Sequence, residues 1–252
     1  MPTVAGIMCT WEEESMVPTA IDSVKNHIDE LIVVNKPGQD NTEETIRDKC
    51  ASVGLKLILV NNPMKLRFAR LHAFTLTDGD WCLIVDGDEV YHTDGEAGLH
   101  RLEELTSVEA CYRAPMNYLY LDFFHTRNTQ TQHASHKFLY PNNEKIVLMK
   151  NKRDLPNYRG EIINLNEVYK FNCGIKPSKR LFYRRRYWWE WSKRYDGELG
   201  FYEWVEKHKI NAEKLLPKNP FKQKDVIPYD EKRWGVRPKV ICDLIEKGKM
   251  KP

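Results

Sequence analysis

The first 90 residues contain short apolar blocks, separated by longer stretches in which apolar residues recur at helical spacing. The apolar runs of strand length are Val4–Met8, Leu31–Val34, Leu55–Val60 and Trp81–Val85. The stretches with helical spacing are Thr19–His27, Thr42–Val53 and Phe68–Leu76. This order predicts strands that alternate with helices, which is typical of a mostly parallel α/β sheet flanked by helices. Thr42 is the predicted N-cap of the second helix, and Gly54 is its predicted stop.

Polar clusters follow three of the predicted strands, at the point where each strand ends. These clusters are Thr10–Glu14, Asn35–Asn41 and Asp86–Glu89. The carboxyl ends of parallel strands meet at one edge of a sheet, and ligands bind in the crevice beyond that edge. We therefore expect the three clusters to converge on one site.

The rest of the chain has a different pattern. Shorter runs predict strands at Val108–Met116, Asn117–Phe124, Lys137–Tyr140, Lys145–Met149 and Glu167–Phe171. From about residue 176 the chain is rich in Arg, Lys and Trp, with a helical pattern over 182–216 and a last short helix at Val240–Glu246. We divide the chain into a main domain, residues 1–170, and a helical, basic C-terminal extension, residues 171–252.

Charge is distributed unevenly between these two parts. Residues 1–170 contain 18 Lys and Arg against 25 Asp and Glu, a net charge of −7, whereas residues 171–252 contain 21 against 11, a net charge of +10. A basic part beside an acidic part favours an anionic partner, although solvated helix faces give the same asymmetry.

Other features bear on the location of the protein. No stretch approaches 18 consecutive apolar residues, and the N-terminus lacks the basic and apolar segments of a signal peptide. The six cysteines are scattered without a CxxC pair, which predicts reduced, mostly buried thiols rather than a zinc site. We expect a cytoplasmic protein, and the sequence does not indicate its oligomeric state.

Asp86-Gly87-Asp88 is the strongest chemical signal in the chain. The apolar run Trp81–Val85 leads directly into these acids and Glu89. Two carboxylates in one turn can present oxygens to a hard cation such as Mn²⁺ or Mg²⁺, which also binds the phosphates of a nucleotide. We expect Gly87 to allow close approach of a ligand and unusual backbone angles. A solvated acidic turn is the alternative interpretation of the tripeptide alone.

The order of these features resembles that of the family 2 glycosyltransferases, which share the GT-A (Rossmann-like) fold. The segments that carry the resemblance are Ala5–Glu13, Leu31–Thr42, Phe68–Arg70, Gly79-Asp80-Trp81 and Asp86–Glu89. The resemblance covers about residues 3–92. It implies a metal-dependent enzyme that transfers a sugar from a nucleotide-diphosphate sugar to an acceptor hydroxyl. A UDP-sugar is the favoured donor, and the configuration at the anomeric carbon is expected to be inverted.

The resemblance also implies roles for individual residues. Asp86 and Asp88 hold the metal and the diphosphate, and Asp88 takes part in catalysis. Arg70 contacts the diphosphate or steadies the acids. Base and ribose contacts come from the loops that contain Thr10, Glu12, Asn35 and Asp40. Asn35 stands where the family commonly has an aspartate, which leaves the nucleotide open. From the residues alone, Arg70 could also be a helix-surface arginine, Glu12 an exposed acid, and Asp40 a helix-capping residue.

An inverting transferase needs a base that takes the proton of the acceptor. Glu161 in Tyr158-Arg159-Gly160-Glu161 is our candidate by resemblance, with Asp122 and Asp154 as rivals and a surface acid as the alternative. His125, His133 and His136 are candidates for a metal ligand or an acceptor contact, or ordinary loop histidines. The place where relatives have a metal-binding histidine corresponds to Asn172-Cys173-Gly174, which lacks it.

The segment Arg180–Tyr195 interleaves basic and aromatic residues. It is either an amphipathic helix packed on the main domain or a contact surface for phosphates and bases. A hydroxymethylated pyrimidine in DNA, as in viral base-modifying transferases, is one candidate acceptor. Cell-surface glycans, peptides and lipid-linked sugars are the others. A non-catalytic nucleotide-sugar-binding protein and a metal phosphohydrolase are the competing classes, and the latter should carry more His and Asp ligands.

Overall fold

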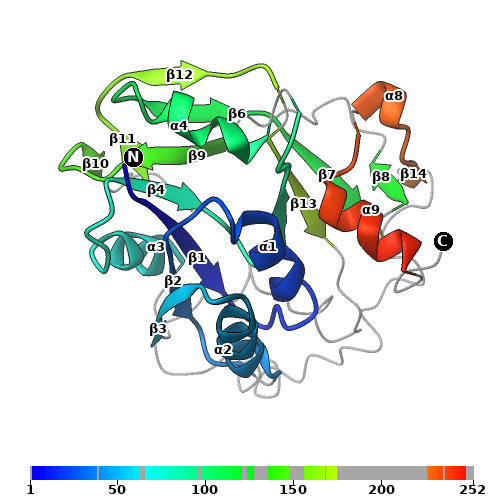
Figure 1. Cartoon of the computed structure of the whole chain (residues 1–252), viewed down its shortest axis with the longest axis horizontal. Helices are drawn as coiled ribbons and strands as arrows, with labels where there is room; N and C mark the ends of the chain where they lie inside the picture. Colours follow the sequence, from blue (N-terminus) through cyan, green and yellow to red (C-terminus); the bar gives the residue numbers. More distant parts are fainter. Residues whose placement is uncertain are drawn as a thin grey trace, which may run out of the picture.

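The computed structural model of the chain describes residues 2–38, 40–62, 66–95, 98–120, 124–127, 136–147, 156–167, 169–174, 226–234 and 236–247. Within them, seven strands form the main sheet (Figure 1). In spatial order these strands are β12 (Ile162–Asn164), β6 (Cys111–Ala114), β9 (His136–Pro141), β4 (Trp81–Ile84), β1 (Val4–Thr10), β2 (Glu30–Asn35) and β3 (Lys56–Asn61). All neighbours pair in parallel except β9, which runs antiparallel to β4 and β6. The predicted mostly parallel α/β sheet is confirmed.

The described helices are α1 (Val17–Val24), α2 (Thr42–Val53), α3 (Leu66–Phe74), a 3-10 turn η1 (Leu99–Arg101), α4 (Leu102–Leu105), α8 (Glu231–Trp234) and α9 (Lys239–Glu246). The helices up to α4 cover the two faces of this sheet. Side chains from α1, α2, η1 and α4 bury one face, and α3 buries the other. Alternate residues of β1 face the two layers: Val4 and Met8 point to one, and Ala5, Ile7 and Cys9 to the other. A strand buried on both sides reads as a continuous apolar run, as the sequence showed.

Three small sheets complete the described fold. They are β10 (Ile146–Val147) with β11 (Asn157–Tyr158), β5 (Glu89–Tyr91) with β13 (Lys170–Gly174) and β7 (Met116–Tyr120), and β14 (Val226–Pro228) with β8 (His125–Arg127). A third apolar cluster joins β5, β7 and β13 to α9, so that residues far apart in the chain lie side by side. The expected domain boundary after residue 170 falls inside β13.

Local sequence explains where the predicted elements begin and end. Helix α2 has the predicted bounds and ends at Gly54, whose φ of 68° is left-handed. Its N-cap is Asn41 rather than Thr42, because Thr42 already lies in the first turn. The strand expected at Val108–Met116 forms β6 and ends at Ala114, because Pro115 has no N–H to donate to a ladder. Met116 begins β7, which covers the first part of the strand expected at Asn117–Phe124.

The six cysteines are free thiols, five of them buried, as expected. Across the part of the chain that the structure describes, we find no helix with the length and apolarity needed to span a membrane.

Candidate functional site

The carboxyl ends of β1, β2 and β3 are joined by hydrogen bonds between uncharged side chains. Thr10 Oγ1 donates to Asn35 Oδ1 at 3.0 Å, and Asn35 Nδ2 donates to Asn61 Oδ1 at 2.9 Å. Thr10 and Asn35 are both buried. Asn61 Nδ2 then donates to Glu43 at the start of α2, at 2.6 Å. We call Thr10, Asn35 and Asn61 the amide ladder; Asn61 was not predicted as a site residue.

The acidic loop after β4, residues 86–89, packs directly against the turn after β1. A Cβ atom added at Gly87 would lie 3.0 Å from Val17 Cγ2 and 3.1 Å from both Glu13 Cβ and Thr10 Cγ2. Gly87 is therefore required by the close approach of two loops. Its φ is not in the left-handed region, so the expected unusual backbone angle is not present. The predicted convergence of the polar clusters on one edge of the sheet is confirmed.

Glu12 and Gly38 bring the loops after β1 and β2 together. Glu12 is buried with a φ of 56°, a left-handed conformation that costs a non-glycine residue about 1–3 kcal/mol. A Cβ atom at Gly38 would lie 2.3 Å from Glu12 Cγ, so the Glu12 side chain lies against the Gly38 backbone. Beside it, Lys36 Nζ lies 4.3 Å from the centroid of the buried Trp11 ring. The alternative of an exposed Glu12 is wrong.

Asp40 links the same two loops to the start of α2. One carboxylate oxygen accepts from Thr42 Oγ1 at 2.7 Å and from Thr42 N at 3.2 Å. The other accepts from Glu14 N at 3.2 Å. These contacts are those of a loop-closing and helix-capping residue, the alternative that the sequence left open.

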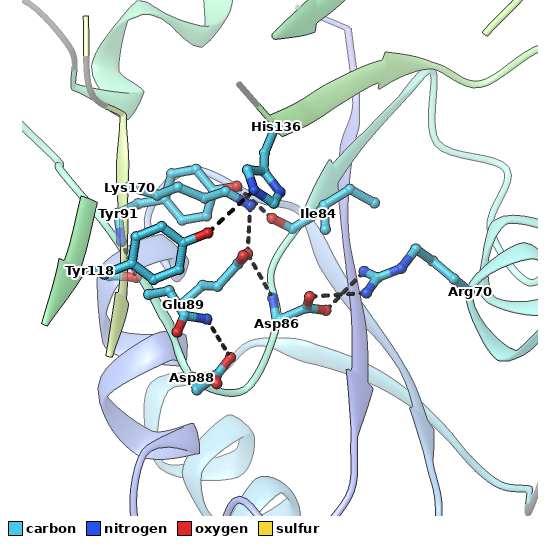
Figure 2. Close-up of polar contacts among 11 residues, drawn as sticks. Arg70, Ile84, Asp86, Asp88, Glu89, Tyr91, Tyr118, His136 and Lys170 are labelled. Atoms are coloured by element: carbon cyan, nitrogen blue, oxygen red, sulfur yellow. Dashed lines mark hydrogen bonds and ion pairs between the residues drawn. The ribbon is translucent and has the colours of Figure 1, made fainter. Parts of the chain in front are cut away.

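Arg70 lies beneath the acidic loop and pairs with Asp86. Its guanidinium is 1% exposed, and its two terminal nitrogens donate to the two Asp86 oxygens at 2.8 and 2.9 Å (Figure 2). Burial lowers the pKa of Arg70, but the charge and hydrogen bonds of Asp86, together with the charge of Glu89 and other nearby groups, hold the pKa above its ordinary value. The alternative of a helix-surface arginine is wrong, and Arg70 holds the first acid of the pair in a fixed orientation.

A second buried ion pair lies on the other side of the loop. Lys170 Nζ of β13 is 2.6 Å from Glu89 Oε2, and the two side chains are 3% and 5% exposed. The same Glu89 oxygen accepts from Asp86 N at 3.4 Å. Burial raises the pKa of Glu89, while the charge of Lys170 opposes the rise. Lys170 was not predicted as a site residue.

Asp88 is held by β13 through both its backbone and its side chain. Cys173 N donates to Asp88 O at 2.7 Å, and Asn172 Nδ2 donates to Asp88 Oδ1 at 3.1 Å. Asn172 Oδ1 is buried and has no hydrogen-bond partner. The segment that lacks the family histidine thus places an amide beside the second acid, with an oxygen whose hydrogen-bonding capacity is unused.

His136 and Tyr118 lie next to these groups at the same edge. Tyr118 Oη and His136 Nε2 are 3.5 Å apart, and Figure 2 shows the pair beside Lys170 and Glu89. Burial, reinforced by the charge of Lys170, lowers the pKa of His136 to about 4. Its imidazole is therefore neutral at pH 7. Of the three histidine candidates, it is the one whose side chain the structure describes.

The structure does not bring Glu161 to this edge. Glu161 is exposed and precedes β12, where its carbonyl accepts from Cys111 N at 2.9 Å. Because β12 and β6 run in the same direction as β4, their first residues lie at the opposite edge from Asp86 and Asp88. The prediction of Glu161 as the base therefore has no support from its position. The rivals Asp122 and Asp154 and the segment Arg180–Tyr195 lie outside the described residues.

Comparison with known proteins gives the site a context. Residues 7–146, more than half of the chain, match the family described as glycosyl transferase family 2. The chain belongs to glycosyl transferase family 2. A TPR repeat-containing protein of Synechococcus elongatus is 32% identical over 89 residues, which are 35% of this chain and 21% of that protein. The chain thus spans about a fifth of the length of that relative.

Two solved structures are similar to parts of the chain. TarS of S. aureus matches with a TM-score of 0.47 and 16% identity, over 72% of this chain and 38% of its own. Glucosyl-3-phosphoglycerate synthase of Mycobacterium tuberculosis, determined with Mn²⁺ and UDP, matches with a TM-score of 0.34 and 20% identity, over 46% of this chain and 43% of its own. The GT-A fold expected for a family member is confirmed by the sheet and helix order of the chain itself.

The side chains at the acidic loop fit a hard divalent cation. Asp88 supplies a carboxylate, and Asn172 faces it with its amide nitrogen. The unused Asn172 oxygen would be a second hard donor for the same cation only after the amide turned over. No group of three His, Cys, Asp or Glu side chains with metal-binding geometry occurs among the residues that the structure describes. This composition suits Mg²⁺ and Mn²⁺, which proteins commonly hold with one or two carboxylates while phosphate oxygens and water supply the other ligands.

Proposed function

We propose that the chain binds a nucleoside diphosphate sugar together with Mn²⁺ or Mg²⁺ and transfers the sugar to an acceptor hydroxyl. The observation that supports this most strongly is the meeting of two unlike surfaces at one edge of the sheet. The amide ladder offers uncharged hydrogen-bonding groups, and the acidic loop beside it offers carboxylates. A nucleoside diphosphate has the same two parts, an uncharged base and ribose and a charged diphosphate.

The residues divide this work between them. Asn35 and Thr10 would contact the base and ribose, with the Glu12 turn and the Asp40 loop beside them. Asp88 would hold the cation, and the Asn172 oxygen would join it once that amide has turned over. Asp86, fixed by Arg70 through both carboxylate oxygens, retains lone pairs that can accept a ribose hydroxyl or the cation.

The bound cation supplies Lewis-acid stabilisation of the charge that develops on the departing diphosphate. The protein contributes the orientation of the acids. Two buried cations, Arg70 and Lys170, fix the carboxylates of Asp86 and Glu89, so little rearrangement of the loop is needed when the donor binds. UDP-sugars are the first donors to test, because an amide oxygen at Asn35 can accept the N–H of uracil.

The test is a thermal-shift screen of nucleotide sugars with and without Mn²⁺, followed by assays of sugar transfer or donor hydrolysis. We expect one class of nucleotide sugar to raise the melting temperature only when Mn²⁺ is present. Glu161→Gln is the matched control for substitutions at the site, since it neutralises an acid at the opposite edge of the sheet. Absence of any nucleotide- and cation-dependent shift in the wild-type protein would contradict the proposal.

The acceptor is a separate question. Transfer to hydroxymethylated pyrimidines in DNA remains a prediction from sequence, and it can be tested by offering modified and unmodified duplexes to the protein with its preferred donor. Glycan, peptide and lipid-linked acceptors are the competing substrates in the same assay.

A further inference from the structure

Strand β13 contacts the acidic loop at three successive points, although it lies about 80 positions later in the chain. Lys170 reaches Glu89 (Figure 2). Asn172 reaches the Asp88 side chain, and the Cys173 amide reaches the Asp88 carbonyl. The antiparallel register with β5, in which Lys170 lies opposite Tyr91 and Asn172 opposite Glu89, sets these contacts.

The side chains of β13 alternate between two environments. Lys170 and Asn172 share one face of the strand and contact the acidic loop. Phe171 and Cys173 point to the other face, into the apolar cluster with α9. Because that cluster holds the strand, the position of Lys170 is fixed from behind.

The burial of Lys170 and Glu89 carries an energetic cost. Each buried ion carries a desolvation penalty of several kcal/mol, and a well-packed apolar pair is often at least as stable. Stability alone therefore does not account for an ion pair here. The Glu89 carboxylate, in contrast, accepts from the Asp86 amide as well as from Lys170, and so links β13 to the backbone of the loop.

We propose that Lys170 is a positioning residue of the donor site, which acts through Glu89 to hold the acidic loop in the geometry that binds the cation and the diphosphate. This inference rests on the proposed function. In this role Lys170 would contact Glu89 and not the cation or the donor. Its effect is on the orientation of the two aspartates, as with groups that orient the ligands of a metal.

The decisive variant is the double substitution Glu89→Gln, Lys170→Met. It leaves the net charge of the site unchanged and buries no unpaired ion, so the fold is expected to persist with a melting temperature close to that of the wild type. We expect its affinity for Mn²⁺, measured by titration in the presence of UDP and without turnover, to fall by about 10- to 100-fold. In assays, the concentration of Mn²⁺ that gives half-maximal rate should rise correspondingly.

The single substitution Lys170→Met tests the direction of the change in cation affinity. Removal of a positive charge should tighten cation binding if simple attraction decides it, whereas loss of positioning should weaken binding. The matched control is Glu30→Gln, Lys56→Met, which removes an ion pair of the same 2.6 Å length at the opposite edge of the sheet. We expect this control to bind Mn²⁺ like the wild type.

The two proposals fail in different ways. A wild-type protein that binds neither Mn²⁺ nor a nucleotide contradicts the proposed function. A wild-type protein that binds both, together with a folded double variant of unchanged Mn²⁺ affinity, overturns the role of Lys170 alone. If Lys170→Met folds and binds Mn²⁺ more tightly than the wild type, the role is overturned as well.

Discussion

The two halves of the site are built from different interactions. At the ends of β1, β2 and β3 the amide ladder joins the strands through neutral hydrogen bonds, whereas around β4, β5 and β13 two buried ion pairs hold the acidic loop. Neutral groups distinguish between ligands by matching their hydrogen-bond donors and acceptors. Charged groups stabilise charge on a ligand through their electrostatic field and their fixed orientation. On the proposed function, we expect the ladder side to govern which nucleotide binds and the charged side to govern whether the sugar is transferred.

The largest effect is expected at Asp88. Substitution with Asn keeps its size but removes a carboxylate from the proposed cation site, so we expect transfer to fall by about a thousandfold, which corresponds to roughly 4 kcal/mol of lost transition-state stabilisation. The fold should be retained, because Asn can still accept from Asn172. The measurement is the transfer rate as a function of Mn²⁺ concentration. An active Asp88→Asn protein would remove Asp88 from the cation site.

Arg70 tests the charged half through stability. Arg70→Met leaves the Asp86 carboxylate without its buried partner. Because the Asp86 side chain is 25% exposed, we expect a loss of roughly 2–3 kcal/mol, less than for a fully buried pair. Urea denaturation measures it. Arg47→Met, which breaks an exposed pair with Glu43 on α2, is the control and should cost less than about 0.5 kcal/mol.

Asn35 tests the neutral half through selectivity. Its amide offers both a donor and an acceptor, whereas Asn35→Asp offers acceptors only at neutral pH. We expect the variant to favour a base that presents an N–H at ring position N3, as uracil does and cytosine does not, so that the ratio of UDP to CDP affinity rises by about tenfold, or 1.4 kcal/mol. Titration of both nucleotides with Mn²⁺ gives the ratio. An unchanged ratio would show that Asn35 does not face the base.

The smallest effect is expected from His92, which directly follows β5 and packs behind the charged half. Burial lowers the pKa of His92 from 6.5 to about 4, and its ring packs edge-on against Phe171 of β13. The unfolded chain binds a proton that the folded protein excludes. His92 therefore contributes stability that is present above pH 6.5 and is lost as the pH falls towards 4. His92→Phe keeps the aromatic contact and should flatten this part of the curve of melting temperature against pH. The number of protons taken up on unfolding should fall by up to about one. An unchanged curve would exclude the assignment.

Sequence patterns predicted the first half of the fold well, for a physical reason. Runs such as Leu31–Val34 are apolar because parallel strands are buried on both faces, and the residue after each run must then lie at one edge. The edge of the sheet at which a residue lies also depends on how its strand pairs with other strands, and local sequence patterns do not contain that information. Glu161 matched a local motif, but the pairing of β12 with β6 places it at the far edge, and no local pattern encodes that register.

Lys170 and Asn172 show what a closer reading could have found. A lysine between Tyr169 and Phe171 is a charged residue within an apolar strand, and burial of such a residue demands a partner. The sequence gives no indication that the partner is Glu89, which lies about 80 residues earlier. The amide ladder has the same origin: Asn35 and Asn61 each end a strand, and only the parallel register brings them together.

The packing of α9 behind β13 has a consequence for biosynthesis. A nascent chain contains Asp86 and Asp88 early, but the cluster that backs Phe171 includes Ile241. Until the ribosome has released that helix, Lys170 and Asn172 lack their support, and the emerging polypeptide should not yet capture a donor. Removal of residues 239–246 from the finished protein is then expected to disturb the orientation of Asp86 and Asp88, although the deleted helix does not include them.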